Sequence, residues 1–309
     1  MSKKQIPLLE QIKNHKVEEG EGNKHVSFSQ VHTYHVCPRQ WDLLYRRRVL
    51  PYQASIHTLF GTAFHETVQE WLGVMFEESA KKADEMDLDL LLYDKISSLY
   101  KDQVERMEGH FSTKEELQEF WEDGIQILSY LKKHRGEYFS PRTQKLVGIE
   151  TPLYRELHPG IYFKGFIDVI LYDTVTETFQ VVDIKTSTSG WNSYAKTDEG
   201  KLSQLLLYRK YLSLQFSIPE DKIKVEYFIV KRKIQEDAPY AAMKKRVQRF
   251  EPPSGKMKMN KAQEMVDTFI SETLDLEKKE YIDRTYHANI EGKGCRFCPF
   301  KKTEHCLES

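Results

Sequence analysis

Apolar residues recur with helical spacing through the first half of the chain. A helix is predicted to begin near Ser27 and to reach the arginines at 46–48, and a second is predicted from about His57 to Ala80, because apolar residues return there every three or four positions. Residues 84–138 keep a helical pattern but carry no chemical motif, which indicates a helical insertion.

The second half of the chain changes to the shorter alternation that is typical of strands. The elements expected there are strands at 145–154, 161–172 and 178–187, a helix at about 199–216, a strand at 223–233, a loop at 235–257 and a helix at about 261–280. The order helix, three strands, helix, strand predicts an α/β fold with a four-stranded mixed sheet.

Composition and charge limit the class of protein. The chain has 309 residues, of which 39% are hydrophobic, and its formal net charge is -1. A neutral total argues against a histone-like DNA coat but leaves room for local basic patches. We find no signal peptide and no apolar run of the roughly 20 residues that a membrane span needs. We therefore expect a cytoplasmic protein, in which cysteines serve more readily as metal ligands than as disulfides.

Two acidic residues lie inside apolar strand stretches. Asp168 stands in Phe-Ile-Asp-Val-Ile and Asp183 in Val-Val-Asp-Ile-Lys. Side chains alternate along a strand, so Asp183 and Lys185 share a face. A turn centred near residues 175–176 would place Asp168 opposite Asp183, where two like charges destabilise the pair unless a cation lies between them.

This set of groups suits phosphodiester hydrolysis. Two carboxylates and the backbone carbonyl of Ile184 offer hard oxygen ligands to Mg²⁺ or Mn²⁺. Lys185 is placed to orient water or to stabilise developing negative charge. An Asp-x-Lys triplet is common by chance, and the prediction depends on the strand context, because isolated carboxylates are costly to bury.

Other polar residues are ambiguous when each is taken alone. His65 lies beside the apolar face of its helix and is either a metal ligand or a structural histidine. Glu150 in the first strand is interpreted as an edge charge. Gln204 and Tyr208 are four residues apart and share a helix face, which either contacts DNA or is simply solvated. The basic runs at 46–48, 231–233 and 244–246 are candidate phosphate contacts, although such runs are usually solvated surface.

In combination, these elements resemble the PD-(D/E)XK nuclease superfamily, and specifically its RecB-like branch. The resemblance covers about residues 57–233 apart from the insertion, with Asp183 where many members have Glu. It implies that His65 joins Asp168 and Asp183 as a metal ligand. It also implies that Gln204 and Tyr208 act near the active site and the DNA.

Three of the four cysteines lie close together at the end of the chain. The tail carries a Cys-x-x-Cys pair and a third cysteine, and the fourth lies more than 250 residues earlier; the four are Cys37, Cys295, Cys298 and Cys306. Four thiolates can bind either structural zinc or a [4Fe–4S] cluster, and a proline after two of them favours iron–sulfur.

This arrangement resembles the iron–sulfur nucleases, namely the AddB nuclease domain and the four-cysteine CRISPR-associated exonucleases. The resemblance implies a cluster that fastens the chain ends together and has no redox role. One departure is the spacing between the last two cysteines, which is seven residues (Pro299 to His305) where those families usually have five.

The sequence thus predicts an α/β nuclease with a PD-(D/E)XK core and an iron–sulfur-bound periphery. The expected division is a flexible arm at 1–26, an iron–sulfur-stapled periphery at 27–56 and 258–309, a nuclease core at 57–83 and 139–257, and the helical insertion at 84–138. We expect a Mg²⁺- or Mn²⁺-dependent deoxyribonuclease acting on single-stranded DNA or duplex ends. The resemblance suggests exonuclease action in recombination, repair or phage- or CRISPR-related processing, with a helicase or recombination proteins as partners. Two alternatives are a catalytically silent DNA-binding subunit and a zinc-stabilised interaction protein.

Overall fold

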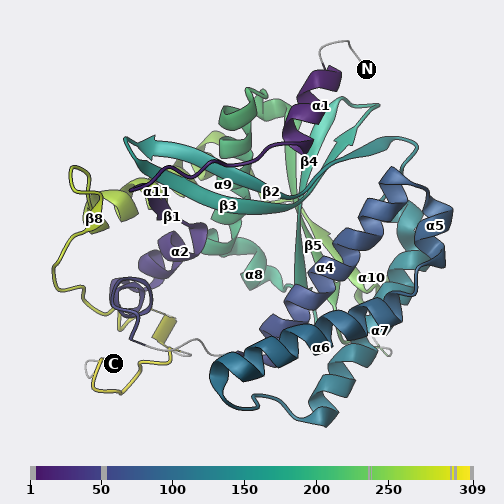
Figure 1. Cartoon of the computed structure of the whole chain (residues 1–309), viewed down its shortest axis with the longest axis horizontal. Helices are drawn as coiled ribbons and strands as arrows, with labels where there is room; N and C mark the ends of the chain where they lie inside the picture. The colour runs from purple at the N-terminus through teal and green to yellow at the C-terminus, as the bar shows by residue number, and fades with distance from the viewer. Residues whose placement is uncertain are drawn as a thin grey trace.

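A curved mixed sheet separates two groups of helices in the computed structural model (Figure 1). The structure describes residues 5–49, 54–235, 237, 239–292, 294, 295 and 298–306. Within these residues the main sheet has six strands in the order β1-β3-β4-β5-β6, with β2 also paired to β3. The strands are β1 (Lys24–Val26), β2 (Gln144–His158), β3 (Ile161–Asp173), β4 (Thr178–Ser187), β5 (Ile223–Lys231) and β6 (Val247–Phe250), with a separate pair β7 (Leu274–Asp275) and β8 (Glu280–Tyr281).

The helices fall on both sides of this sheet. Their bounds are α1 (Gln5–Lys13), α2 (Phe28–Val36), α3 (Pro38–Trp41), α4 (Ile56–Glu77), α5 (Ala80–Glu85), α6 (Leu88–Met107), α7 (Lys114–Tyr138), α8 (Ser193–Thr197), α9 (Glu199–Phe216), α10 (Ala241–Lys244) and α11 (Lys256–Thr273), with a π-helix at Asp42–Arg46 and a 3-10 turn at Glu220–Lys222. Figure 1 shows α4 to α7 on one side and α2, α9 and α11 on the other. The helices expected in the insertion are present as α6 and α7, and α9 has the predicted bounds.

Two hydrophobic cores lie on the two faces of the sheet. Ile170 and Val181 pack in the core with α9 and α11, whereas Val182 and Ile184 pack in the core with α4, α6 and α7. From Val169 onward β3 is buried on both faces, but before that point only alternate residues are buried. The middle of β3 is therefore where the sheet changes from one covered face to two.

The β3–β4 hairpin has the register that the sequence predicts. The pairs run from Asp173 opposite Thr178 to Val169 opposite Val182. The Asp173 carboxylate fixes the turn because it accepts hydrogen bonds from the backbone N–H groups of Val175 (2.9 Å) and Thr176 (2.8 Å). The backbone pairing ends at Val169 and Val182, so Asp168 and Asp183 are the next opposite positions, at the point where the two strands separate.

The sheet contains two strands that were not predicted. The expected flexible arm instead contains α1 and β1, and β1 pairs in parallel with the start of β3. The expected loop at 235–257 instead contains α10 and β6, and β6 pairs with β5. Both extra strands have only three or four residues, which is too short for an alternating pattern to be recognised.

Two predicted helices also differ from the structure. The first is interrupted at Cys37, whose extended backbone ends α2 and begins α3, because Pro38 occupies the first position of the next helix. The final helix begins five residues earlier than predicted and ends at Thr273, since the backbone of Leu274 is extended and pairs with Tyr281. None of the described helices has the length and apolar character that crossing a membrane requires.

Candidate active site

Asp168 bridges the gap that opens between β3 and β4. Its Oδ2 accepts a hydrogen bond from the backbone N–H of Ile184 (2.7 Å) and lies 3.5 Å from Nδ1 of His65. The side chain thus takes the place of the backbone pairing that ends one residue earlier. As a result, the acid is held at a fixed position between the two strands and α4.

Asp183 and Lys185 lie on the same face of β4, as their alternation requires. The Nζ of Lys185 is 2.7 Å from Oδ2 of Asp183, and the side chain of Lys185 is 34% exposed whereas that of Asp183 is 3% exposed. The ammonium of Lys185 is therefore the partner of this buried carboxylate oxygen. A buried carboxylate is costly unless a cation is paired with it, and here one lysine serves a site that contains two acids.

Burial and mutual repulsion shift the titration of the site. Burial, and then the negative charge of Asp183, raises the pKa of Asp168 to about 8. Burial lowers the pKa of His65 to about 4. Burial opposes the charge of Lys185, yet Asp183 and Asp168 outweigh it and raise the pKa of this lysine. At neutral pH, the contact between His65 and Asp168 therefore joins a neutral ring to a protonated carboxyl, and is not an ion pair.

Helix α4 contributes a second polar residue that sequence reasoning missed. Gln69 lies one turn after His65, and its Nε2 donates to Oε1 of Glu150 (2.6 Å) and to the backbone carbonyl of Asp168 (3.3 Å). Glu150 was expected to be an edge charge; it does lie on the edge strand β2, but directly opposite Asp168, and its charge adds to the raised pKa of that acid. The spacing of four from His65 was the available signal for Gln69.

Gln204 and Tyr208 face the same site from α9. The amide of Gln204 donates to Oη of Tyr208 (3.3 Å), and the ring of Tyr208 lies against Gly165 of β3, where a Cβ would come within 3.2 Å of it. Burial raises the pKa of Tyr208 to about 12, so its hydroxyl keeps its proton at neutral pH. The structure thus brings together His65, Asp168, Asp183, Lys185 and the Gln204–Tyr208 pair.

The carboxylate oxygens and the imidazole nitrogen at this place are ligands that Mg²⁺ and Mn²⁺ accept. Among the described residues, no group of three or more His, Cys, Asp or Glu side chains is already arranged around a common point as a metal site. The fit to a cation is instead indicated by two acids that share one lysine, because the charge of Asp183 adds to burial in raising the pKa of Asp168.

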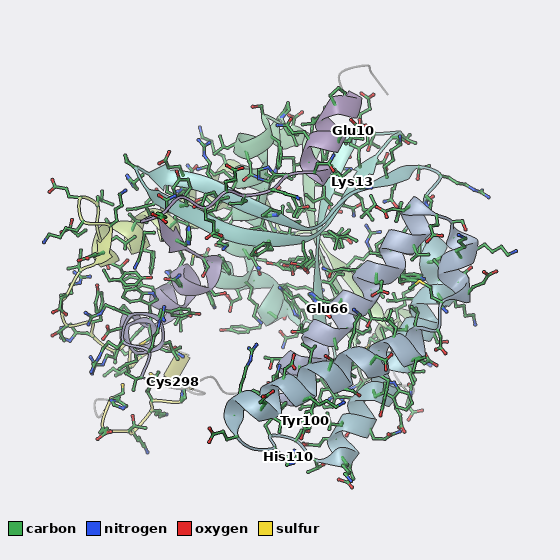
Figure 2. All side chains as sticks on the ribbon, in the orientation of Figure 1. Glu10, Lys13, Glu66, Tyr100, His110 and Cys298 are labelled. Atoms are coloured by element: carbon green, nitrogen blue, oxygen red, sulfur yellow. The ribbon has the colours of Figure 1, made fainter. Side chains whose placement is uncertain are left out.

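The four cysteines line one narrow cavity far from the acids in the sequence. Cys37, Cys295, Cys298 and Cys306 all contribute to it, and burial together with the charges of the other three raises the pKa of the Cys298 thiol. Sγ of Cys37 accepts hydrogen bonds from the backbone N–H groups of Gln40 (3.4 Å) and Asn289 (3.5 Å). Figure 2 shows Cys298 in the peripheral region, away from Glu66, the neighbour of His65 on α4.

The guanidinium of Arg39 also holds the two ends of the chain together. Its Nε and Nη2 donate to the backbone carbonyl of His305 (3.2 and 3.1 Å), and its Nη1 lies 3.6 Å from the buried carboxylate of Asp42. Arg39 therefore fastens the tail that carries three cysteines beside the segment that carries the fourth. Figure 1 shows this tail beside the segment that follows α2.

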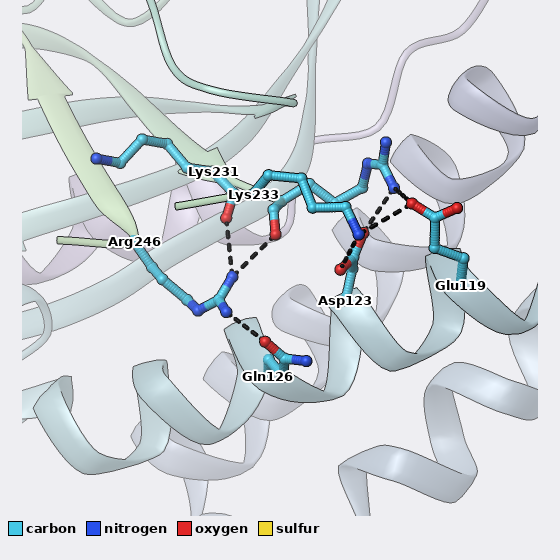
Figure 3. A network of polar contacts seen from close by, with 7 residues as sticks. Glu119, Asp123, Gln126, Lys231, Lys233 and Arg246 are labelled. Atoms are coloured by element: carbon cyan, nitrogen blue, oxygen red, sulfur yellow. Dashed lines mark hydrogen bonds and ion pairs between the residues drawn. The ribbon is translucent and has the colours of Figure 1, made fainter. Parts of the chain in front are cut away.

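Residues of two of the three basic runs bond to the insertion (Figure 3). Arg232 bonds to Asp123 of α7 (2.6 Å), and Lys233 lies 2.8 Å from Asp123 and 2.9 Å from Glu119. Arg246 donates to the backbone carbonyl of Arg232 (2.9 Å) and to Gln126 of α7. These side chains join β5 and β6 to the insertion, because their partners Glu119, Asp123 and Gln126 all lie on α7. Their interpretation as free phosphate contacts is therefore wrong for Arg232 and Arg246.

Comparison with known proteins gives a family for this arrangement. A model of the PD-(D/E)XK nuclease superfamily matches residues 25–303. A search of curated proteins returned no match. A solved structure from Eubacterium rectale, described as a "Putative exonuclease", is 13% identical; the alignment covers 79% of this chain and 78% of that chain with a TM-score of 0.45. At that similarity neither fold nor activity can be carried over from it.

Proposed function

Because the chain belongs to the PD-(D/E)XK nuclease superfamily, we propose that it is a Mg²⁺- or Mn²⁺-dependent deoxyribonuclease of the RecB-like type. The observation that carries this proposal is the pair of buried acids, Asp168 and Asp183, at the point where β3 and β4 separate, with Lys185 at 2.7 Å from the second acid. A structural ion pair would need one carboxylate for one lysine. Here two carboxylates face one lysine, which leaves room for a cation.

Asp168, Asp183, the ring of His65 and the backbone carbonyl of Ile184 would hold the ion. When bound there, Mg²⁺ or Mn²⁺ neutralises charge on the phosphate and lowers the pKa of a water molecule. The low pKa of His65 suits this role, since the ring is neutral and offers a lone pair at physiological pH. Asp168 would lose its proton when the ion binds, which makes binding depend on pH.

Lys185 acts on the reacting phosphate in this proposal. Its raised pKa keeps the ammonium charged, and the exposed part of its side chain reaches the open side of the site. An ammonium at this place stabilises the negative charge that develops on the phosphate oxygens and orients water. Tyr208, with its proton retained, and Gln204 supply neutral donors that position the DNA strand.

The proposed activity is tested with Lys185→Ala on end-labelled linear DNA and on circular DNA, with Mg²⁺ or Mn²⁺. Removing a group that stabilises transition-state charge is expected to reduce kcat by about 100-fold or more. Exposed Lys224→Ala on the neighbouring strand β5 is the matched control and should cut like the wild type. Equal cleavage by all three proteins would exclude a role for Lys185. Binding of DNA by the wild type without any cutting would instead support a silent DNA-binding subunit.

We further propose that the enzyme is an exonuclease that acts in recombination, repair or phage- or CRISPR-related DNA processing. This narrower role rests on the resemblance to RecB-like nucleases, and a helicase or recombination protein as partner stays a prediction. The circular substrate decides the first part, because a strict exonuclease leaves closed circles intact. Cutting of circles would contradict it without affecting the assignment of the catalytic residues.

We also propose that Cys37, Cys295, Cys298 and Cys306 hold a structural [4Fe–4S] cluster. Support comes from the shared cavity and from the N–H groups that point at Sγ of Cys37, since hydrogen bonds to sulfur are a normal part of such sites. The site lies apart from the acids, so its role is to hold the chain ends together. Anaerobically purified protein should contain equal amounts of iron and acid-labile sulfide. A colourless protein with one bound zinc would contradict the cluster and favour a Cys₄ zinc site.

A further inference from the structure

A second polar cavity lies at the carboxyl ends of β4 and β5, beyond the acids. Its volume is about 440 Å³, and Gly190, Trp191, Lys231 and Gln248 belong to its wall. The described wall contains two lysines and no carboxylate. Ligands of open α/β sheets bind outside the carboxyl ends of the strands, and this volume lies within the range of small-molecule sites.

The cavity continues the face of the sheet that carries the acids. Asp183 is paired with Tyr227 on β5, and Ser187 is paired with Lys231 four residues further along both strands. Residues two apart on a strand share a face and lie about 7 Å apart. Ser187 therefore follows Lys185 on the same face, and Lys231 follows Tyr227.

Lys231 is a buried cation for which the described residues provide no carboxylate. The residue is only 6% exposed, and its Nζ donates to the backbone carbonyl of Met243 (2.9 Å). Burial, and then the nearby charge of Arg246, lowers its pKa, and no acid acts in the opposite direction. The neighbouring Lys233 differs, because Asp123 and Glu119 neutralise it. An anion in the cavity would balance Lys231.

Trp191 supplies a rigid aromatic wall to the same cavity. Its backbone N–H donates to Oε1 of Gln248 (2.7 Å), and Nε2 of Gln248 donates back to its carbonyl (3.0 Å). The indole ring packs against the ring of Tyr227 with the centroids 4.7 Å apart. Gly190, at φ 92°, allows this close approach, because a Cβ there would meet Lys231 and Gln248 at 3.0 and 3.1 Å. The half-buried ring is thus fixed before any ligand binds.

We propose that this cavity is a nucleotide subsite for an unpaired DNA strand, in which the base stacks on Trp191 and the phosphate contacts Lys231. The inference rests on the proposed nuclease function and specifies its substrate as a single-stranded segment next to the cleaved bond. An aromatic ring beside a cation is the usual combination for such strands, because every base has a face that stacks and every nucleotide has a phosphate.

The test measures binding of a fluorescent single-stranded oligonucleotide by anisotropy in EDTA, over a series of salt concentrations. Trp191→Leu is expected to raise Kd by roughly 5- to 150-fold, the fold-change that corresponds to losing one base–aromatic stack, and Trp191→Phe should recover most of it. Lys231→Met should lower the slope of log K against log salt by about 0.7, the value for one phosphate contact on a single strand, and Lys231→Arg should restore it. Trp121→Leu and Lys101→Met, from an aromatic cavity of the insertion, are the matched controls.

Steady-state cleavage separates this inference from the proposed function. Trp191→Leu should raise KM on single-stranded DNA by the same factor as Kd and change kcat much less. If the wild type cuts DNA but neither variant changes Kd, KM or the salt slope, the subsite is wrong and the nuclease assignment stands. If the wild type binds but does not cut, the anisotropy still decides the subsite. If it does not bind DNA at all, both are wrong.

Discussion

Replacement of Asp168 by Asn should stabilise the metal-free protein although it abolishes cleavage. Asn keeps the shape of the side chain but carries no charge, so it removes the cost of burying a second carboxylate beside Asp183. The pKa of Asp168 is raised to about 8 from an ordinary value of 3.8, first by burial and then by Asp183. In the wild type, a proton bound to Asp168 avoids this cost at low pH.

The sign and size of the effect follow from this shift. A raised folded-state pKa means that the folded protein binds the proton more tightly than the unfolded chain, so its stability falls as pH rises from about 4 towards 8. Each pH unit in this window costs about 1.4 kcal/mol, and the loss between pH 5 and pH 7 is about 3 kcal/mol. The free energy of unfolding of Asp168→Asn should not show this decrease between pH 5 and pH 7.

Urea unfolding in EDTA at pH 5 and pH 7 measures the difference. The free energy of unfolding of the wild type should fall relative to that of Asp168→Asn by about 3 kcal/mol, since other titrating groups are common to both. The exposed Asp94→Asn is the control and should follow the wild type. Mn²⁺ at 100 times its Kd should stabilise the wild type by about 2.7 kcal/mol and have much less effect on Asp168→Asn. Equal pH dependence of the two proteins would refute the uncompensated charge on which the metal site rests.

Three further predictions concern the rest of the molecule. Asp123→Ala should destabilise the protein by about 3–5 kcal/mol in chemical unfolding, because the buried Arg232 loses its counter-charge. Glu119→Ala, whose side chain is 52% exposed, should cost less than about 1 kcal/mol, and similar losses for the two variants would contradict the network. Gly124→Ala should lower the free energy of unfolding by about 1–3 kcal/mol, because the added Cβ would lie 2.4 Å from Leu92. An unchanged free energy of unfolding would contradict this, because it would mean that Leu92 moves aside at no cost. Cys298→Ser should reduce the iron content and the Tm of the protein. An unchanged iron content would show that Cys298 is not a ligand of the cluster.

The sequence predicted the central hairpin because its information is local. Apolar alternation fixed the two strands, and a symmetric turn near residues 175–176 was enough to put Asp168 opposite Asp183, as the pairs down to Val169 and Val182 confirm. Helix α9 was also predicted, since Asp198 caps its start and its leucines form a continuous apolar pattern. These elements needed no knowledge of distant partners.

Features that depend on distant partners could not be predicted. Strand β1 has three residues and exists only because β3, more than 130 residues later, offers an unpaired edge. The basic run ending at Arg246 has the composition of a solvated loop, but Arg246 itself is buried against backbone carbonyls and Gln126. Gln69 was missed because a glutamine on a helix has no meaning until the strands it bonds to are known.

The hairpin that carries both acids also has a consequence for the order in which the site can assemble. Asp168, Asp183 and Lys185 are separated by a turn of only four residues, so their pairing closes a short loop and requires only local contacts. His65 belongs to a helix that the whole insertion separates from these strands, and its arrival closes a loop of about a hundred residues. We therefore expect the nascent chain to form the repulsive acid pair first, neutralised by a proton, and to complete the ligand set only when α4 docks.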